Sequence, residues 1–147
     1  MPLSLRKATP DDASDLLAWR NDPVTRAMSR NSDLVDAADH ARWFQRALQD
    51  VACTLLIGED DGRKIGMVRL ARGEETEVSI NLNPAVRGRG LSRELLMRAL
   101  AQERGALLAV IKPENLASIR LFEGAGFVLQ DTHEGLSRYR RPAGPAP

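Results

Sequence analysis

Two glycines stand where a strand is expected to end and a helix to begin, and arginines flank them. Gly88 and Gly90 alternate with Arg87 and Arg89, just before a helical pattern that starts at Leu91. The first turn of a helix offers free backbone N–H groups and the positive end of the helix dipole, so such a turn binds anions, phosphate above all. Glycine lets the backbone approach an anion closely, and arginine adds charge. The alternative is an exposed basic turn without a ligand.

Two common phosphate-binding loops do not match this stretch. A dinucleotide-binding fingerprint needs a third glycine where Arg93 stands. A P-loop needs a Gly-Lys-Ser/Thr ending, which these residues lack. The glycine loop therefore predicts a site for another phosphate-bearing cofactor.

The segment before this loop alternates apolar and polar residues, as a strand does when one face is buried. Its apolar side consists of Val78, Ile80 and Leu82. Its polar side carries Glu77, Ser79 and Asn81. These polar residues are candidates to line a site beside the loop.

Hydrophobic periodicity predicts the elements that position these residues. Helices are expected at 10–19, 36–49, 91–104 and 115–125, with a short helical piece at 24–28. Strands are expected at 3–5, 54–58, 64–70, 77–82, 106–111, 127–131 and 136–140. The order β-α-α-β-β-β-α-β-α-β-β indicates an α/β or α+β fold, with a mixed, mostly antiparallel sheet flanked by helices. The continuous apolar run at 106–111 predicts a strand that is covered on both faces.

Length and composition narrow the classes of protein. The 147 residues suit one domain, expected over 1–141, with 142–147 as a flexible tail. The 21 Lys and Arg nearly balance the 20 Asp and Glu, which excludes nucleic-acid binding by bulk electrostatics. No apolar run suits a membrane span or a secretory signal, so we expect a cytoplasmic protein with no membrane partner. Cys53 is the single cysteine, and no residue pattern indicates a metal site.

Two stretches resemble motifs of the GCN5-related N-acetyltransferase (GNAT) superfamily. Residues 82–91, LNPAVRGRGL, resemble its coenzyme A pyrophosphate loop, Gln/Arg-x-x-Gly-x-Gly/Ala, although Ser92 takes the last position when the motif is read from Arg87. Residues 115–127, NLASIRLFEGAGF, resemble its later motif, Asn-x-x-Ser-x-x-x-Tyr/Phe-x-x-x-Gly-Phe, with the spacing intact. The expected order of elements is also that of the family, over about residues 3–141.

The resemblance implies a GNAT fold in which acetyl-CoA lies between strands 77–82 and 106–111. Amides of the glycine loop would hold the pyrophosphate. Asn115 would contact the cofactor from the other side, or cap the helix that it precedes. Ser118 would do the same, or bond within the first helical turn. The implied cofactor-binding residues are Leu82, Arg87, Gly88, Arg89, Gly90, Leu91, Ser92, Asn115, Ser118 and Phe122.

The implied reaction is attack of a primary amine on a thioester, which needs no protein nucleophile. The amine must be neutral: one with a pKa of about 8 is neutral in about one molecule in ten at pH 7, and a lysine-like amine far more rarely. Glu77 is the candidate base or water-orienting carboxylate, unless it is an ordinary exposed glutamate. Phe122 stands where many members have a tyrosine that protonates the leaving thiolate. Ser79 and Tyr139 are the candidate substitutes, although Tyr139 is also expected to pack its ring within the sheet.

Residues 19–28 and 39–44 resemble the branch of the family that acetylates nucleotide-linked 4-amino sugars. They resemble less closely the branch that modifies the N-termini of ribosomal proteins. Arg20 and Arg26 would meet a diphosphate, and Trp19 would stack on a base or sugar unless it belongs to the core. The implied substrate-binding residues are Trp19, Arg20, Asn21 and Arg26.

Three functions stay open. The first is an N-acetyltransferase of a small-molecule amine such as an amino sugar, and the second acts on peptide or protein amines and would need an acidic groove. The third is a non-catalytic acyl-CoA-binding protein, suggested by Phe122 and Ser92. An exposed strand edge could also pair two copies of the chain, so a homodimer is a further expectation.

Overall fold

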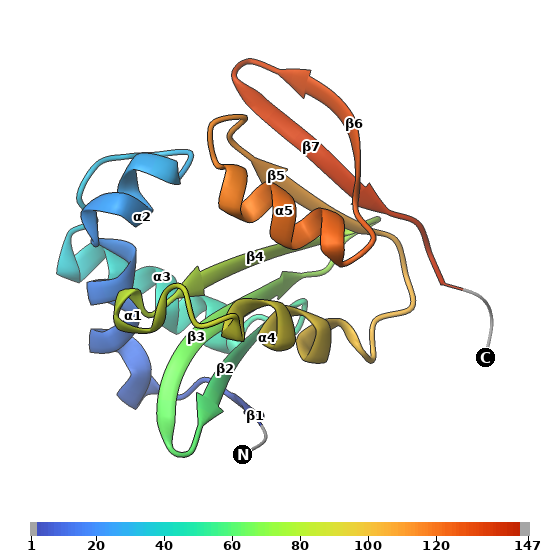
Figure 1. The fold of residues 1–147 in the computed structure, drawn as a ribbon. Helices are drawn as coiled ribbons and strands as arrows, with labels where there is room; N and C mark the ends of the chain where they lie inside the picture. Colours follow the sequence, from blue (N-terminus) through green and yellow to red (C-terminus); the bar gives the residue numbers. More distant parts are fainter. Residues whose placement is uncertain (1–2, 145–147) are drawn as a thin grey trace.

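The computed structural model describes residues 3–144, in which seven strands form one sheet with the order β1-β2-β3-β4-β5-β7-β6 (Figure 1). The strands are β1 (Leu3–Lys7), β2 (Cys53–Asp60), β3 (Arg63–Ala71), β4 (Thr76–Leu82), β5 (Leu107–Ile111), β6 (Val128–His133) and β7 (Leu136–Arg141). The helices are α1 (Ala13–Arg20), α2 (Pro23–Met28), α3 (Ala37–Gln49), α4 (Leu91–Leu100) and α5 (Leu116–Gly124), with 3-10 turns η1 (Pro10–Asp12) and η2 (Pro84–Val86). The expected order of elements and the mixed sheet are confirmed, although α4 ends before 104. Residues 145–147 of the expected tail lie outside the described part.

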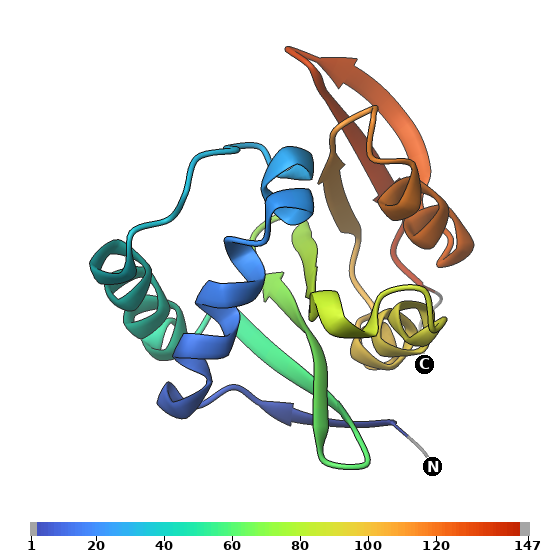
Figure 2. The same ribbon diagram turned by 60° about the vertical axis from the view of Figure 1, so that its left-hand side comes forward.

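Helices cover both faces of the sheet (Figure 2), and an apolar cluster lies between the helices and the sheet on each face. Helices α1 and α3 pack on one face, around Leu16, Phe44 and Ile57. Helix α4 and Phe122 of α5 pack on the other face, in a cluster that includes Leu95. The sheet is therefore the middle layer of three, and side chains that alternate along its strands face different helices.

The hairpin between β2 and β3 sets the register of the central strands. It turns at Asp61 and Gly62, whose φ angles of 53° and 79° are those of a tight turn that favours Asp-Gly. The expected turn over 59–62 is thus shorter in the structure. Further along, β3 pairs with β4 so that Arg69 lies opposite Ser79. This register places Arg69 and the predicted polar side of β4 on one face of the sheet.

The parallel pair β4 and β5 separates soon after it forms (Figure 1). Only Thr76 with Leu107 and Glu77 with Leu108 are paired, whereas β4 keeps its pairing with β3 as far as Leu82. The later part of β4 therefore has a pairing partner on one side only. This is the opening that the family resemblance implies.

The expectation that the strand over 106–111 is covered on both faces is wrong. Leu107, Ala109 and Ile111 are buried, but Leu108 and Val110 are only half-buried. The reason is that α1 and α3 pack over the strands β2 to β4 and leave this face of β5 open. A continuous apolar run can therefore belong to a strand with one face beside a cavity, as well as to a strand that is buried on both faces.

The sheet ends at β1 on one side and β6 on the other. All six residues of β6 are exposed, so the homodimer through a strand edge stays a prediction. Cys53 is half-buried at the start of β2, and no other cysteine lies within reach in the described residues. Over residues 3–144, none of the helices has the length and apolarity to cross a bilayer. The same residues contain no cluster of three potential metal ligands.

Candidate active site

The glycine loop has the backbone conformation that its composition predicts. Gly88 and Gly90 have φ angles of 79° and 74°, and Gly90 is the residue that precedes the first turn of α4. Other residues adopt such angles at a cost, which explains why glycine stands at both positions. A methyl group added at either glycine would meet no atom within 4 Å. The space beside the loop is open, as a bound phosphate group requires.

Arg87 is engaged within the protein rather than free. Its Nη2 donates to Asp22 Oδ2 at 2.6 Å and to Thr25 Oγ1 at 2.7 Å. Asp22 in turn caps α2 by accepting from the N–H groups of Val24 and Thr25. The Arg87 guanidinium holds the pKa of Asp22 below its usual value. Arg87 thus links the loop to α2, and Arg89 is left exposed beside the loop.

A cavity of about 470 Å³ lies where β4 and β5 separate, and we call it the strand-gap cavity. It gathers several residues predicted from the sequence: Glu77, Ser79, Asn115, Ser118 and Phe122. The Asn115 Oδ1 accepts from the Ser118 N–H at 3.2 Å, so the expected capping role is confirmed. The Phe122 ring is buried and packs edge-on against Phe127 at a centroid distance of 5.0 Å. These residues give the cavity both polar and apolar lining.

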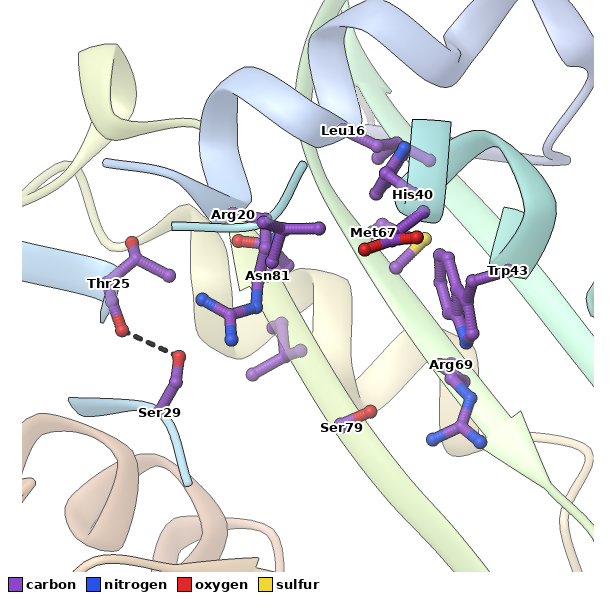
Figure 3. A pocket seen from close by; sticks show the side chains of 13 residues that line it. Leu16, Arg20, Thr25, Ser29, His40, Trp43, Met67, Arg69, Ser79 and Asn81 are labelled. Atoms are coloured by element: carbon purple, nitrogen blue, oxygen red, sulfur yellow. Dashed lines mark hydrogen bonds between the residues drawn. The ribbon is translucent and has the colours of Figure 1, made fainter. Parts of the chain in front are cut away.

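A second cavity of about 480 Å³ lies on the other side of β4, under α1 and α3 (Figure 3), and we call it the helix-side cavity. Its polar lining includes Arg20, Arg69, Ser79 and Asn81. Its apolar lining is Leu16, Val35, Trp43, Met67 and Ile80. Five residues line both cavities, which therefore meet: Arg20, Ser29, Arg69, Ser79 and Ile80.

Three polar atoms in the walls of the helix-side cavity are buried and have no hydrogen-bond partner within residues 3–144. They are Arg20 Nη1, Arg69 Nε and Asn81 Oδ1. Buried polar groups are normally satisfied, so a cluster of exceptions points to a group that the protein binds. Burial and the nearby charge of Arg26 lower the pKa of Arg20. Two of the three atoms belong to guanidinium groups that form no ion pair within residues 3–144, and the third is an amide oxygen that can accept a hydrogen bond.

His40 and Glu77 border these cavities with different electrostatic surroundings. Burial and the charge of Arg20 lower the pKa of His40, so its imidazole is neutral at pH 7. Its ring stacks with Phe44 at 6.0 Å. Glu77 Oε2 accepts from Arg30 Nη2 at 2.5 Å, and its side chain is one-third exposed. Glu77 is thus fixed at the edge of the strand gap by an arginine of the loop after α2.

The residues predicted for the acceptor only partly come together. Arg20 lines both cavities, but Trp19 is 6% exposed in the core under α1, so the expectation that it stacks on a ligand is corrected. Asn21 exchanges two hydrogen bonds with the backbone of Val35. Arg26 donates to the backbone of Ser32 at 3.2 Å. The last two side chains therefore shape the segment between α2 and α3.

Four further predicted positions lie away from both cavities. Tyr139 is 5% exposed in the core, on β7 opposite Ala109, so its ring packs as the sequence also allowed and gives no support to a role as an acid. Leu82 ends β4 opposite Gly66 and lines neither cavity. Leu91 and Ser92, half-buried, open α4. The glycine loop and these residues lie outside the lining of the two cavities.

Sequence reasoning missed Arg69, Trp43 and Met67 as lining residues of the helix-side cavity. One signal was available. Arg69 interrupts the apolar segment Ile65–Leu70, which is otherwise buried. A charged residue inside such a strand needs a partner or a cavity.

Comparison with known proteins fits this geometry. Residues 3–128 match the model of the acetyltransferase (GNAT) domain. The chain is 30% identical over 119 residues to the uncharacterized N-acetyltransferase YfmK of Bacillus subtilis, covering 78% of this chain and 77% of that protein. It is 29% identical over 110 residues to the L-methionine sulfoximine/L-methionine sulfone acetyltransferase of Salmonella typhimurium, covering 67% and 64%.

Among solved structures, yncA of Salmonella typhimurium, described as a putative acetyltransferase with its cofactor acetyl-CoA, has a TM-score of 0.80 at 24% identity. The match covers 100% of this chain and 98% of that one, which shows a common fold. The relatives give no support to the amino-sugar or ribosomal branch. The domain match, together with the split between β4 and β5 and the glycine loop before α4, shows that this chain belongs to the GNAT family of N-acetyltransferases.

Proposed function

We propose that this protein transfers the acetyl group of acetyl-CoA to a primary amine of a small molecule. The observation that carries the proposal is the meeting of two cavities at Ser79 and Ile80, one in the strand gap and one under α1 and α3. A donor in the first and an acceptor in the second would meet at β4. Such an arrangement brings the amine close to the thioester without a covalent enzyme intermediate.

The residues of the glycine loop suit the cofactor. Gly88 and Gly90 leave open space beside the start of α4, where N–H groups and the helix dipole favour the pyrophosphate. Exposed Arg89 adds positive charge there. Asn115, Ser118 and Phe122 line the strand gap and would contact the arm that carries the thioester.

Acetyl-CoA supplies a thioester carbonyl, at which the C–N bond forms and the C–S bond breaks with release of the thiol. In this proposal Glu77 accepts the amine proton through water, and its position at the edge of the strand gap, where Arg30 donates to it, supports that role. Phe122 has no proton to give to the leaving thiolate. A thiol with a pKa of about 8.5 leaves without a strong acid, so this loss is compatible with turnover.

A small-molecule acceptor matches the volume of the helix-side cavity, about 480 Å³, better than a peptide does. The relative from Salmonella typhimurium named above acts on a small molecule, according to its name. The amino-sugar acceptor has less support, because Trp19 is buried and the polar groups of Asn21 and Arg26 bind backbone atoms. We therefore retain only the coarser class, a small primary amine.

Thiol release from acetyl-CoA in the presence of a panel of primary amines tests the proposal. We expect steady turnover with at least one small amine and calorimetric binding of CoA. Tight binding of CoA without turnover on any amine would instead indicate the non-catalytic acyl-CoA-binding protein. For Glu77, the variant Glu77→Gln should change the pH–rate profile, and an unchanged profile would rule out its role as a base.

A further inference from the structure

Two arginines where the cavities meet carry positive charge that no acidic side chain balances. Neither Arg20 nor Arg69 forms an ion pair anywhere in residues 3–144, although both are half-buried. Arg20 Nη2 donates to the backbone oxygen of Asn31 at 2.7 Å, and Arg69 forms no side-chain hydrogen bond with the described residues. A buried charge is costly unless an opposite charge meets it. An anionic group of the acceptor would meet both.

The acidic groups that reach the two cavities are already engaged. Asp39 lines the helix-side cavity but contacts Arg42, and its side chain is 67% exposed. Glu77 lines the strand-gap cavity but is paired with Arg30. His40 is neutral, for the reasons given above. The net charge offered to a ligand between Arg20 and Arg69 is therefore positive.

The position of the two arginines limits how far the anion can lie from the reacting amine. Arg20 and Arg69 each line both cavities, and in Figure 3 Ser79 lies between their guanidinium groups. The anion would thus sit at the junction, which is also where the amine must meet the thioester. Both groups then have to be close neighbours in one molecule. An amine and a carboxylate on the same carbon atom satisfy this condition.

The remaining lining describes the rest of the acceptor. Beyond the junction the helix-side cavity presents Leu16, Val35, Trp43 and Met67, which favour an uncharged side chain. Asn81 Oδ1 is a buried acceptor without a partner, and it can accept from an N–H of the ligand. A polyamine would instead place further positive charge beside two arginines.

We propose that the acceptor is an α-amino acid or a close analogue, with its carboxylate between Arg20 and Arg69 and its uncharged side chain in the helix-side cavity. This inference rests on the proposed function and narrows it. It assigns Arg69, which was not among the residues predicted from sequence, to substrate binding. It also accounts for the buried Arg20 Nη1 and Arg69 Nε atoms, which have no partner among the described residues.

A matched series of acceptors tests the inference. L-methionine, methioninamide and the corresponding amine without a carboxyl group share one side chain, and spermidine serves as the polycation. The amide has the amine pKa of a peptide N-terminus, about 8, so slow acetylation of the amide cannot reflect a lack of neutral amine. We expect kcat/KM for the acid to exceed that for the amide about 50-fold or more, as for loss of a charge-assisted contact.

The possible outcomes separate this inference from the proposed function. If the amide, the simple amine or spermidine turns over faster than the acid, the inference about the acceptor is wrong. The proposed N-acetyltransferase activity would then still be supported. Absence of turnover with every amine overturns both.

Arg69→Met provides the second arm, because that side chain forms no hydrogen bond or ion pair within the described residues whose loss would unfold the protein. We expect KM for the amino acid to rise about 10- to 100-fold, with CoA affinity unchanged. The preference for the acid over the amide should fall by the same factor. Arg138→Met is the control, since Arg138 is exposed on β7 and pairs with Asp131. Equal KM values for Arg69→Met and Arg138→Met overturn the inference, provided that both variants melt as the parent does.

Discussion

The buried charged groups at the two ends of α1 differ in whether the protein supplies their partners. Before its N-terminus, Asp12 is 1% exposed and every side of its carboxylate is met. Arg6 donates to both of its oxygens at 2.8 Å, Lys64 lies 2.8 Å away, and the Thr9 N–H donates at 2.8 Å. At the C-terminal end of the same helix, Arg20 keeps a buried nitrogen without any partner.

The difference separates stabilisation from function. Hydrogen bonds from Arg6 and Lys64 hold the pKa of Asp12 far below its usual value, so the folded state favours the ionised form. Burial lowers the pKa of Arg20, so there the folded state disfavours the charge. The first group stabilises the fold, whereas the second has no acidic partner within residues 3–144 and, in our proposal, receives one from the ligand. Four predictions test this contrast.

The largest effect is expected at the satisfied carboxylate. Asp12→Ala leaves Arg6 and Lys64 without their shared partner and should lower the free energy of unfolding by about 3 kcal/mol. Arg69→Met, in the helix-side cavity, should leave the free energy of unfolding within about 0.5 kcal/mol of that of the parent. Urea denaturation of both variants measures the difference. Equal losses would mean that the two sites do not differ in the way described.

Acid should remove the contribution of Asp12. Because its pKa in the folded state lies below the ordinary value of 3.8, stabilisation is complete above about pH 5 and is lost as the pH falls through the folded-state pKa. The parent should therefore lose stability below about pH 4 more steeply than Asp12→Ala does. Thermal melting from pH 7 to pH 2 records both slopes. Parallel curves for the two proteins would contradict the assignment.

Two glycines extend the contrast to the backbone. Gly62 in the hairpin and Gly88 in the loop share a φ of 79°, and an added methyl group would meet nothing at either one. Replacing either glycine by alanine should cost about 1 kcal/mol of stability. Only Gly88→Ala should weaken CoA binding, by about tenfold. Calorimetry that finds equal CoA affinities for the two variants would place the pyrophosphate elsewhere.

Arg87 is the intermediate case, an arginine beside the site that already has partners. Arg87→Met should lower the free energy of unfolding by about 1 kcal/mol or less, because its pair with Asp22 is partly exposed. Acceptor KM should stay within about threefold of the parent, since Arg87 does not line the helix-side cavity. Arg98→Met, which removes an exposed pair with Glu94, is the control. A large rise in acceptor KM for Arg87→Met would contradict the assignment.

Local patterns account for the parts that were predictable from sequence. The polar side of β4 followed from the alternation of residues 77–82, and Asn115 as a cap followed from its place before a helix. The position of Arg69 opposite Ser79 depends on the register of β3 and β4. Nothing local to either strand specifies that register.

The two tryptophans show the same limit. Both lie on helices of the same face, and the sequence left Trp19 open between a ligand and the core and did not single out Trp43 as a lining residue. The structure buries Trp19 in the apolar cluster and brings Trp43, which packs against that cluster, to the wall of the helix-side cavity. Helix packing decides which ring reaches the cavity. An amphipathic pattern predicts which side of a helix is buried, but it does not predict whether that side packs against the core or lines a cavity.

The early separation of β4 and β5 leaves a gap in the sheet that a bound cofactor would bridge. Two residue pairs join the strands on either side of this seam, so a molecule lying in the gap would contact both flanks and bind them to each other. Its binding free energy then adds to the cohesion of the sheet, by about 2.7 kcal/mol at a concentration a hundred times the Kd. The concentration of acetyl-CoA would in this way affect the stability of the protein against unfolding as well as its turnover rate.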